Sequence, residues 1–399
     1  MIAGVATRAG AGISSESNPA GAARAAARAA LAAARMDRAD AALLFATPDH
    51  APALAELLDA ARDELGTDPV GATAQGVLIA GEACERGPGV AVLALAGIEA
   101  EPFLLTEVAG AEHRAGEALA HRLDAPPAGG DLVILLPDPY AVAPAALLAG
   151  IAPALGAARV VGAGAVDGRG TPPAQWAEGE IATGAVAGVV LRSAAPPRIG
   201  VTQACRPVTG PLQVTRSDGH WILEIEGRPA LDVFRETVRG PLAEDLRRAA
   251  AFVFVALPEP GDPEAALSRG DYRVRNVAGF SERGAIAVAE PVRTGERIAF
   301  VLREPHGARD DLKRMLAELV AGGPADFGVY LDCCARGAAL FDVPGLEAAY
   351  LQEALGALPL VGMLGAYEIG PVRGRTEILT YTAILALSGG GEPRGQALA

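Results

Sequence analysis

The sequence predicts an α/β protein with mixed sheets, built from three repeated strand-helix-strand units plus an antiparallel meander, as a pseudo-symmetric sandwich of two interlocked halves. Three observations lead to this prediction. An aspartate precedes an apolar run three times, at Asp40, Asp131 and Asp326. Each run is followed by a helical pattern and then by a Val-Gly pair. Between the second and third units, apolar and polar residues alternate with a period of two, which is typical of antiparallel strands.

The first predicted element is a helix that begins at Asn18-Pro19 and ends near Met36, because asparagine favours the N-cap position and proline the first helical position. In the first repeated unit, leucines and alanines recur at helical spacing over residues 54–65, and Gly66 follows as the C-terminal residue. The second and third units show the same arrangement before Gly156 and Gly356.

The distance from the aspartate to the glycine of the Val-Gly pair is nearly constant. It is 31 residues in the first unit (40 to 71), 31 in the second (131 to 162) and 36 in the third (326 to 362). A final apolar strand is expected near residues 90–95, 185–191 and 378–387. Strand-helix-strand units need crossover connections, so the sheets are expected to be partly parallel. Each repeated glycine marks a close approach, either to a packed element or to a ligand.

The segment between the second and third units predicts a different architecture. Residues 212–225 alternate around Ser217-Asp218-Gly219, which indicates a β-hairpin with Trp221, Leu223 and Ile225 on one face. The antiparallel meander is expected from four apolar runs, at residues 252–257, 272–277, 285–289 and 297–302. A helix capped by Asp310 follows. We place a domain boundary near residue 226, which gives domains of 1–226 and 227–399.

Composition excludes several classes of function. The chain has 34 basic and 48 acidic residues and a net charge of −14, which argues against nucleic acid or an anionic membrane as partner. Four cysteines without C-x-x-C spacing give no disulfide framework, and no signal peptide is recognised, so a cytoplasmic location is expected. Residues 139–158 carry no charge over 20 positions, but their prolines and glycines favour a buried crossover helix over a membrane span.

Standard cofactor and metal motifs are absent from the sequence. There is no P-loop, the Gly162–Gly168 stretch misses the dinucleotide-binding spacing by one residue, and the five histidines are scattered. There is also no G-x-S-x-G elbow of an α/β-hydrolase. We therefore expect no cofactor, no metal and no catalytic residue, and we expect that the protein is not an enzyme.

The candidate binding site lies in the third unit. Cys333 and Arg336 follow its first strand, and Glu368 follows its second strand together with the backbone of Gly362 and Gly365. If the two strands are parallel neighbours, both segments emerge at the same sheet edge, where α/β sheets bind ligands. Arg336 could then hold a carboxylate and Glu368 an amine. The alternative is that Arg336 and Glu368 pair with each other and that the cysteines are inert core residues.

At these residues the chain resembles the FIST family, with its N-terminal and C-terminal FIST domains. The resemblance rests on the order of short motifs along residues 1–387, and the family pattern has glycine where this chain has Tyr367. The motifs are Asp40–Phe45, Val70-Gly71 with Gly76, Asp131–Asp138, Val161–Gly164, Gln203–Pro207, Glu224–Ala230, Arg275-Asn276, Cys333-x-x-Arg336-Gly337 and Glu368–Pro371. The resemblance implies a bacterial cytoplasmic sensory module for small ligands such as amino acids, with Arg275 and Asn276 as further contributors to the site.

Three functions stay open at this point. The first is a small-ligand sensor without its own output domain, whose ligand is an amino acid or small carboxylate and whose response passes to a signalling partner protein. The second is a scaffold that recognises another protein. The third is an enzyme with Cys333 or Cys334 as nucleophile, which lacks a histidine base nearby in the sequence.

Overall fold

The computed structural model describes residues 7–168, 170–193, 195–238, 244–259, 261–372 and 374–389. These residues form two compact units. Unit 1 comprises the chain up to residue 201, residues 313–378 and the chain from residue 382 on, and unit 2 comprises residues 202–312 and 379–381. The domain boundary near residue 226 was placed from the change of pattern along the sequence, and it stays a prediction.

Unit 1 is built from three repeats with the same succession of elements. Each repeat has an edge strand, a helix, a strand, a second helix, a strand, a hairpin and a last strand. The first contains β1 (Arg8–Ser14), α1 (Pro19–Ala34), β2 (Ala41–Ala46), η1 (Pro48–Ala53), α2 (Leu54–Leu65), β3 (Val70–Thr73), β4 (Gly76–Ile79), β5 (Glu82–Cys84) and β6 (Val90–Ala96). The second contains β7 (Ala100–Leu105), η2 (Glu112–Arg114), α3 (Ala115–Ala120), β8 (Leu132–Pro137), α4 (Pro144–Leu155), β9 (Arg159–Ala163), β10 (Gln175–Ala177), β11 (Glu180–Ala182) and β12 (Val186–Leu191). The third contains β13 (Arg198–Gln203), α8 (Pro305–Ala321), β23 (Phe327–Cys333), α9 (Ala338–Phe341), α10 (Leu346–Leu355), β24 (Leu360–Gly365), β25 (Glu368–Val372), β26 (Arg375–Leu379) and β27 (Thr382–Ser388).

The three sheets of unit 1 have equivalent strand orders. They are β1-β6-β2-β3-β10-β11, β7-β12-β8-β9-β25-β26 and β13-β27-β23-β24-β4-β5. In each sheet the strands on either side of the crossover helix are parallel, and the last strand of the repeat is antiparallel to the first of them. The predicted mixed α/β class with three strand-helix-strand units is therefore confirmed.

Each repeat places its hairpin on the sheet of another repeat. The β4-β5 hairpin extends the third sheet, β10-β11 the first and β25-β26 the second, so the exchange is cyclic. Three equivalent backbone hydrogen bonds, each 2.8–2.9 Å long, close the crossover points; they run from Gln75 N to Leu364 O, from Val166 N to Thr73 O and from Ala366 N to Gly164 O. The pseudo-symmetry is consequently threefold, and the prediction of two interlocked halves was wrong on this point.

The repeated aspartate has the same role in each repeat. Asp40 Oδ2 accepts a hydrogen bond of 2.8 Å from Gly97 N, directly after β6, and Asp131 Oδ1 accepts one of 3.0 Å from Ser193 N, after β12. Asp326 faces Gly389, after β27, where an added Cβ would lie 2.0 Å from Asp326 Oδ2. The aspartate thus ties the start of one strand to the end of its antiparallel neighbour.

The repeated glycine serves packing between neighbouring strands. A Cβ added at Gly71, Gly162 or Gly362 would lie 1.7, 2.3 or 2.7 Å from the carbonyl oxygen of the residue opposite on the parallel strand. No side chain fits at such a distance. The sequence left open whether these glycines approach a packed element or a ligand. In the structure each glycine closely approaches a packed strand.

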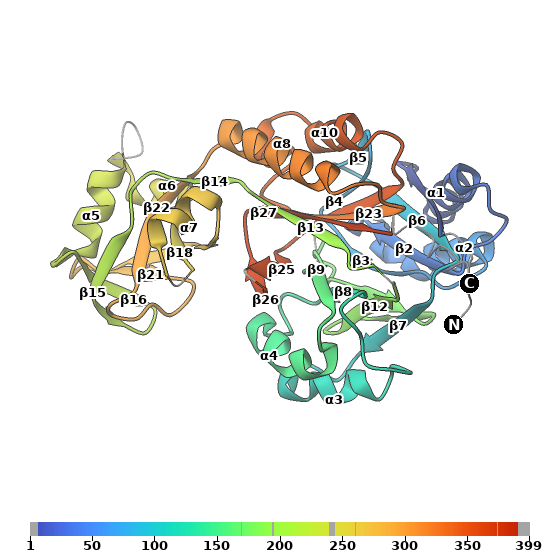
Figure 1. Ribbon diagram of the computed structural model, residues 1–399, viewed down its shortest axis with the longest axis horizontal. Helices are drawn as coiled ribbons and strands as arrows, with labels where there is room; N and C mark the ends of the chain where they lie inside the picture. The colour runs from blue at the N-terminus through green and yellow to red at the C-terminus, as the bar shows by residue number, and fades with distance from the viewer. Residues whose placement is uncertain are drawn as a thin grey trace, which may run out of the picture. The chain divides into compact units, whose positions relative to one another are not determined.

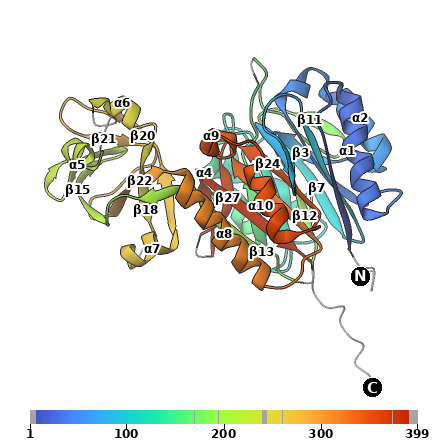
Figure 2. The same cartoon turned by 90° about the horizontal axis from the view of Figure 1, so that it is seen from above.

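Pairs of helices cover the outer faces of the sheets in unit 1 (Figures 1 and 2). Helices α1 and α2 pack together over the first sheet, with Trp176 of β10 in the same core, and α3 and α4 pack over the second. The Asn18 side chain caps α1 as predicted, by accepting a hydrogen bond of 2.7 Å from Gly21 N. Helix α8 begins at Pro305, so the prediction that Asp310 caps it was wrong. Among the described residues, no helix is both long and apolar enough to cross a membrane.

Unit 2 is inserted in the sequence between β13 and α8 and has an antiparallel sheet of nine strands. Its elements are β14 (Cys205–Pro207), β15 (Leu212–Asp218), β16 (Trp221–Ile225), β17 (Arg228–Pro229), α5 (Ala230–Thr237), α6 (Leu246–Ala249), β18 (Val253–Pro258), α7 (Pro263–Arg269), β19 (Tyr272–Arg275), β20 (Val277–Phe280), β21 (Ile286–Val288) and β22 (Arg297–Arg303). The predicted hairpin is β15-β16, and the four predicted runs correspond to β18, to β19 with the start of β20, to β21 and to β22. They do not follow one another as a simple meander, because β22 pairs with β18 and β21 pairs with β16.

Candidate functional site

Arg336 is fully buried in the turn that follows β23, where carboxylates hold its guanidinium. Its Nε lies 2.9 Å from Asp332 Oδ1 and 3.1 Å from Glu347 Oε1 of α10. Glu347 also accepts hydrogen bonds from the Tyr330 hydroxyl at 3.0 Å and from Gly337 N at 3.2 Å. The Nη1 atom of Arg336 is buried without a hydrogen-bond partner among the described residues. Arg336 therefore has Asp332 and Glu347 as its ion-pair partners, and not Glu368 as the alternative interpretation expected.

Burial and mutual charge set the protonation of this cluster. Burial raises the pKa of Asp332 well above its usual range, and the charge of Glu347 raises it further. Burial also acts to raise the pKa of Glu347, but the Arg336 charge and hydrogen bonds from its neighbours outweigh it and lower this pKa. The two acids therefore differ: the pKa of Asp332 is raised, and that of Glu347, the closer partner of Arg336, is lowered.

Glu368 is the second buried acid of the site, at the start of β25. Its Oε2 accepts hydrogen bonds from Thr382 Oγ1 at 2.6 Å and from Thr382 N at 3.3 Å. Its Oε1 is buried without a partner among the described residues. Burial raises the pKa of Glu368 well above its usual range, and Cys333 adds to this, whereas Thr382 and Arg336 act in the opposite direction.

The adjacent cysteines lie beside these acids at the end of β23. Cys333 is buried and Cys334 half-buried, and neither forms a disulfide. A hydrogen bond from the Cys333 side chain lowers the pKa of Cys334, while burial and the charges of Glu368 and Asp332 oppose this effect. Cys334 N donates to Gly365 O at 2.8 Å, which links the ends of β23 and β24.

Of the predicted site residues in unit 1, Cys333 and Gly365 lie opposite each other at the carboxyl ends of β23 and β24, Arg336 follows β23, Gly362 lies within β24 and Glu368 begins β25. The two glycines contact protein there. A Cβ at Gly362 would meet Tyr330 O, and one at Gly365 would lie 2.8 Å from Ala163 Cβ. Their backbone is thus tightly covered by neighbouring strands.

Arg275 and Asn276 belong to unit 2. Arg275 Nε donates to Glu290 Oε2 at 2.7 Å, and its Nη1 donates to Val274 O at 2.9 Å. Asn276 Oδ1 accepts a hydrogen bond of 3.0 Å from the Tyr381 hydroxyl. Their contribution to a ligand site stays a prediction.

Three residues at equivalent positions of the repeats show what distinguishes the third repeat. In the third repeat these are Cys333, Glu368 and Thr382. In the first they are Thr47, Val77 and Gly89, where a Cβ at Gly89 would lie 3.0 Å from Val77 and 3.4 Å from Thr47. In the second they are Asp138, Gln175 and Ala185 by strand register. In the third repeat a thiol replaces the Thr47 hydroxyl, a carboxyl group replaces the apolar Val77 and a hydroxyl group is added at the position of Gly89.

Sequence reasoning missed Asp332, Glu347, Thr382 and Tyr330. A signal for Asp332 was present, because it occupies the position of Ala46 and Pro137 when the repeats are aligned on their aspartates. Glu347 and Tyr330 look like ordinary residues of an amphipathic helix and a strand, and only the fold shows that they meet Arg336.

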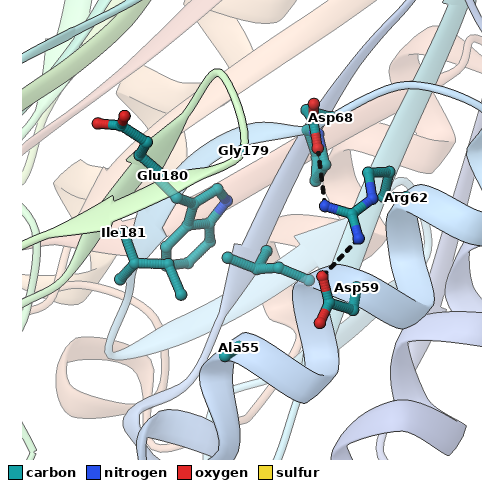
Figure 3. Close-up of a pocket in the computed structure, with 10 residues that line it drawn as sticks. Ala55, Asp59, Arg62, Asp68, Gly179, Glu180 and Ile181 are labelled. Atoms are coloured by element: carbon teal, nitrogen blue, oxygen red, sulfur yellow. Dashed lines mark hydrogen bonds and ion pairs between the residues drawn. The ribbon is translucent and has the colours of Figure 1, made fainter.

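Two cavities of unit 1 are lined by residues other than Cys333, Arg336 and Glu368. One of about 70 Å³ lies between α2 and the β10-β11 hairpin, and Arg62 bridges Asp59 and Asp68 on its wall (Figure 3). Glu180 and Ile181 line it from β11, and the buried indole of Trp176 lines it from β10. A more open hollow of about 580 Å³ lies after β8 and is lined by Asp138 and Tyr140, among others.

Comparison with known proteins identifies two family domains along the chain. A FIST N domain matches residues 40–228, and a FIST C domain matches residues 230–371. Two uncharacterized proteins of Mycobacterium tuberculosis, from strains CDC 1551 and H37Rv, are 32% identical over 360 residues, which cover 87% of this chain and 90% of theirs. An uncharacterized protein of Mycobacterium bovis is 32% identical over 356 residues, which cover 87% of this chain and 89% of its own.

Proposed function

Because the chain belongs to the FIST family, whose domains are sensory domains of signal transduction, we propose that it is a sensor that binds a small cytoplasmic ligand in the third repeat. The ligand is an amino acid or a small carboxylate. The site comprises Cys333, Arg336 and Glu368, at the carboxyl ends of β23 and β24. The response passes to a signalling partner protein.

One observation carries this proposal: the buried polar atoms of the third repeat that lack a hydrogen-bond partner among the described residues include, besides both Asp332 oxygens and the Tyr367 hydroxyl, a donor and an acceptor close to the strand ends. The donor is Arg336 Nη1 and the acceptor is Glu368 Oε1. Buried polar atoms are almost always hydrogen-bonded, so two exceptions of opposite kind favour an occupant that satisfies both. An amino acid has a carboxylate for the guanidinium and an ammonium group for the glutamate.

The bridge between Arg336 and Glu347 is compatible with this role. Glu347 and Asp332 fix the guanidinium and leave Nη1 as the donor that a carboxylate can reach. The ammonium group of a bound ligand favours the ionised form of Glu368, whose pKa is raised in the free protein. Binding therefore releases a proton, and the affinity for an amino acid increases as the pH rises toward the raised pKa of Glu368.

The test is a thermal-shift screen with the twenty standard amino acids, acetate and succinate, followed by calorimetry of each compound that raises the melting temperature. We expect at least one amino acid to bind the wild type and to bind Glu368→Gln at least 10-fold more weakly. The matched control is Gln175→Leu, at the equivalent register position of the first sheet, which should bind as the wild type does. The proposal is wrong if none of these compounds shifts the wild type, or if Glu368→Gln and the wild type bind equally.

A further inference from the structure

We propose that Thr382 is the positioning residue for Glu368 and that Tyr381, its neighbour in the chain, transmits the state of this pair to unit 2. This inference rests on the proposed function, because it assigns the regulation of the same site. It concerns two successive residues that belong to different units: Thr382 is the first residue of β27 in unit 1, and Tyr381 is the last residue of unit 2.

Thr382 holds one oxygen of the Glu368 carboxyl group with two donors. Its hydroxyl donates to Oε2 at 2.6 Å and its backbone N–H donates to the same atom at 3.3 Å. Thr382 is 1% exposed and Glu368 is fully buried, so water does not compete for these hydrogen bonds. The two donors fix the carboxyl plane and leave Oε1 as the atom that faces a ligand.

The other two repeats lack this pair. Gly89 and Ala185 occupy the position of Thr382, and Val77 and Gln175 occupy the position of Glu368. Neither Gly89 nor Ala185 has a hydroxyl group. The threefold scaffold therefore folds without a hydroxyl and a carboxyl at these positions, and the pair is an addition of the third repeat.

Tyr381 is held firmly within unit 2. Its ring stacks on Phe254 at a centroid distance of 4.3 Å and an interplanar angle of 28°. Its hydroxyl donates to Asn276 Oδ1 at 3.0 Å, and its carbonyl oxygen accepts from Ala204 N at 2.8 Å. Its backbone has φ 61°, in the left-handed region that a tyrosine rarely adopts, so the surrounding contacts must impose this conformation.

The covalent connection makes the two residues dependent on each other. A single planar peptide group contains the Tyr381 carbonyl, which is bound in unit 2, and the Thr382 N–H, which is bound to Glu368 in unit 1. A ligand that turns the Glu368 carboxyl group therefore acts on the conformation of Tyr381.

The experiment uses the two tryptophans of the chain as separate reporters, because Trp176 lies in unit 1 and Trp221 in unit 2. In a Trp176→Phe background, the emission of Trp221 is followed while the amino acid with the largest thermal shift is added. We expect a saturable change in Trp221 emission in the protein with Thr382. In Thr382→Val this change should be lost and the affinity for the amino acid should be at least 10-fold lower. Thr382→Ser should restore both the emission change and the affinity. Tyr381→Gly is expected to bind within 3-fold of the wild type but without the Trp221 response.

Positioning is overturned if Thr382→Val binds as tightly as the wild type, and transmission is overturned if Trp221 still responds in Tyr381→Gly. A second arm needs no ligand. Because the Thr382 hydrogen bonds lower the pKa of Glu368, a ¹³C NMR titration of that carboxyl group should give a higher pKa in Thr382→Val and an unchanged one in Thr382→Ser. Equal titration of Thr382→Val and the wild type refutes positioning even if no compound binds, so the outcome is independent of the proposed function.

Discussion

The first and third repeats of unit 1 have the same fold but different interiors at the carboxyl ends of their parallel strands. The first places Thr47, Val77 and Gly89 there, and the third places Cys333, Glu368 and Thr382. Because both repeats fold with the same strand order, the polar residues of the third are not required by the scaffold. Buried charges are costly, so their presence in the third repeat and their absence at these positions of the first favours a role in function.

The largest effect is expected for Arg336→Ala, which leaves the Glu347 carboxylate buried without its ion-pair partner. Removing one member of a buried pair costs about 3–5 kcal/mol of the free energy of unfolding. The matched variant is His50→Ala at the corresponding position of the first repeat, since His50 and Arg336 each lie ten residues after the repeated aspartate. It removes no ion pair and should cost less in urea denaturation. Equal costs would contradict the contrast between the repeats.

The next effect concerns the scaffold that the repeats share. Gly71→Ala introduces a Cβ at 1.7 Å from Leu44 O and is expected to cost about 3 kcal/mol, because a backbone strand must move. The order of destabilisation should be Gly71, Gly162, Gly362, following the distances of 1.7, 2.3 and 2.7 Å. Gly210→Ala, where a Cβ meets nothing within 4 Å, is the control. An order that ignores these distances would show that the glycine is not a packing device.

A smaller effect that depends on pH is expected at Glu368. Because its pKa is raised on folding, the folded protein retains a proton that the unfolded chain loses above about pH 4.3. The free energy of unfolding therefore falls as pH rises from about 4.3 toward the raised pKa, by up to about 1.4 kcal/mol per pH unit. Glu368→Gln has no proton to lose at this position, so its free energy of unfolding does not show this fall. The difference between the variant and the wild type should therefore increase in favour of the variant over the same pH interval, as measured by urea denaturation at several pH values. A constant difference would mean that Glu368 ionises normally.

The smallest effect is expected for the repeated aspartates. Asp40→Asn weakens the acceptor for Gly97 N and should cost about 1 kcal/mol. Asp131→Asn should cost more, because Asp131 also binds Arg192 at 3.0 Å. The melting temperatures of the two variants compare these costs, and a larger loss for Asp40→Asn would contradict the assigned contacts.

Much of the scaffold was predictable from the sequence because its determinants are local. The aspartates, the Val-Gly pairs and the helical periodicity all fall within about 36 residues of one another (326 to 362). The cyclic exchange of hairpins was not predictable, because a hairpin has the same local pattern on whichever sheet it pairs. The expected face of Trp221, Leu223 and Ile225 also differed: Ile222 and Ile225 are buried while Trp221 is 38% exposed, next to a strand with shifted register.

The candidate site was predictable only in outline. The parallel pairing of β23 and β24 follows from the strand-helix-strand pattern and places Cys333 opposite Gly365, whereas Glu368 lies on β25, which pairs with β9 in the second sheet. The partners of Arg336 depend on α10, which packs onto the turn after β23 through tertiary contacts that no local pattern reveals. Thr382 is a short polar residue at a strand start, and its sequence context gives no indication that it donates to a buried acid.

The most direct test of the central claim is a crystal structure of the protein grown with the amino acid that raises its melting temperature most. The account predicts this compound in the third repeat, with its carboxylate on Arg336 Nη1 and its ammonium group on Glu368 Oε1. Density for the compound in the cavity beside Trp176, or in the hollow beside Tyr140, with only water between Arg336 and Glu368, would contradict it.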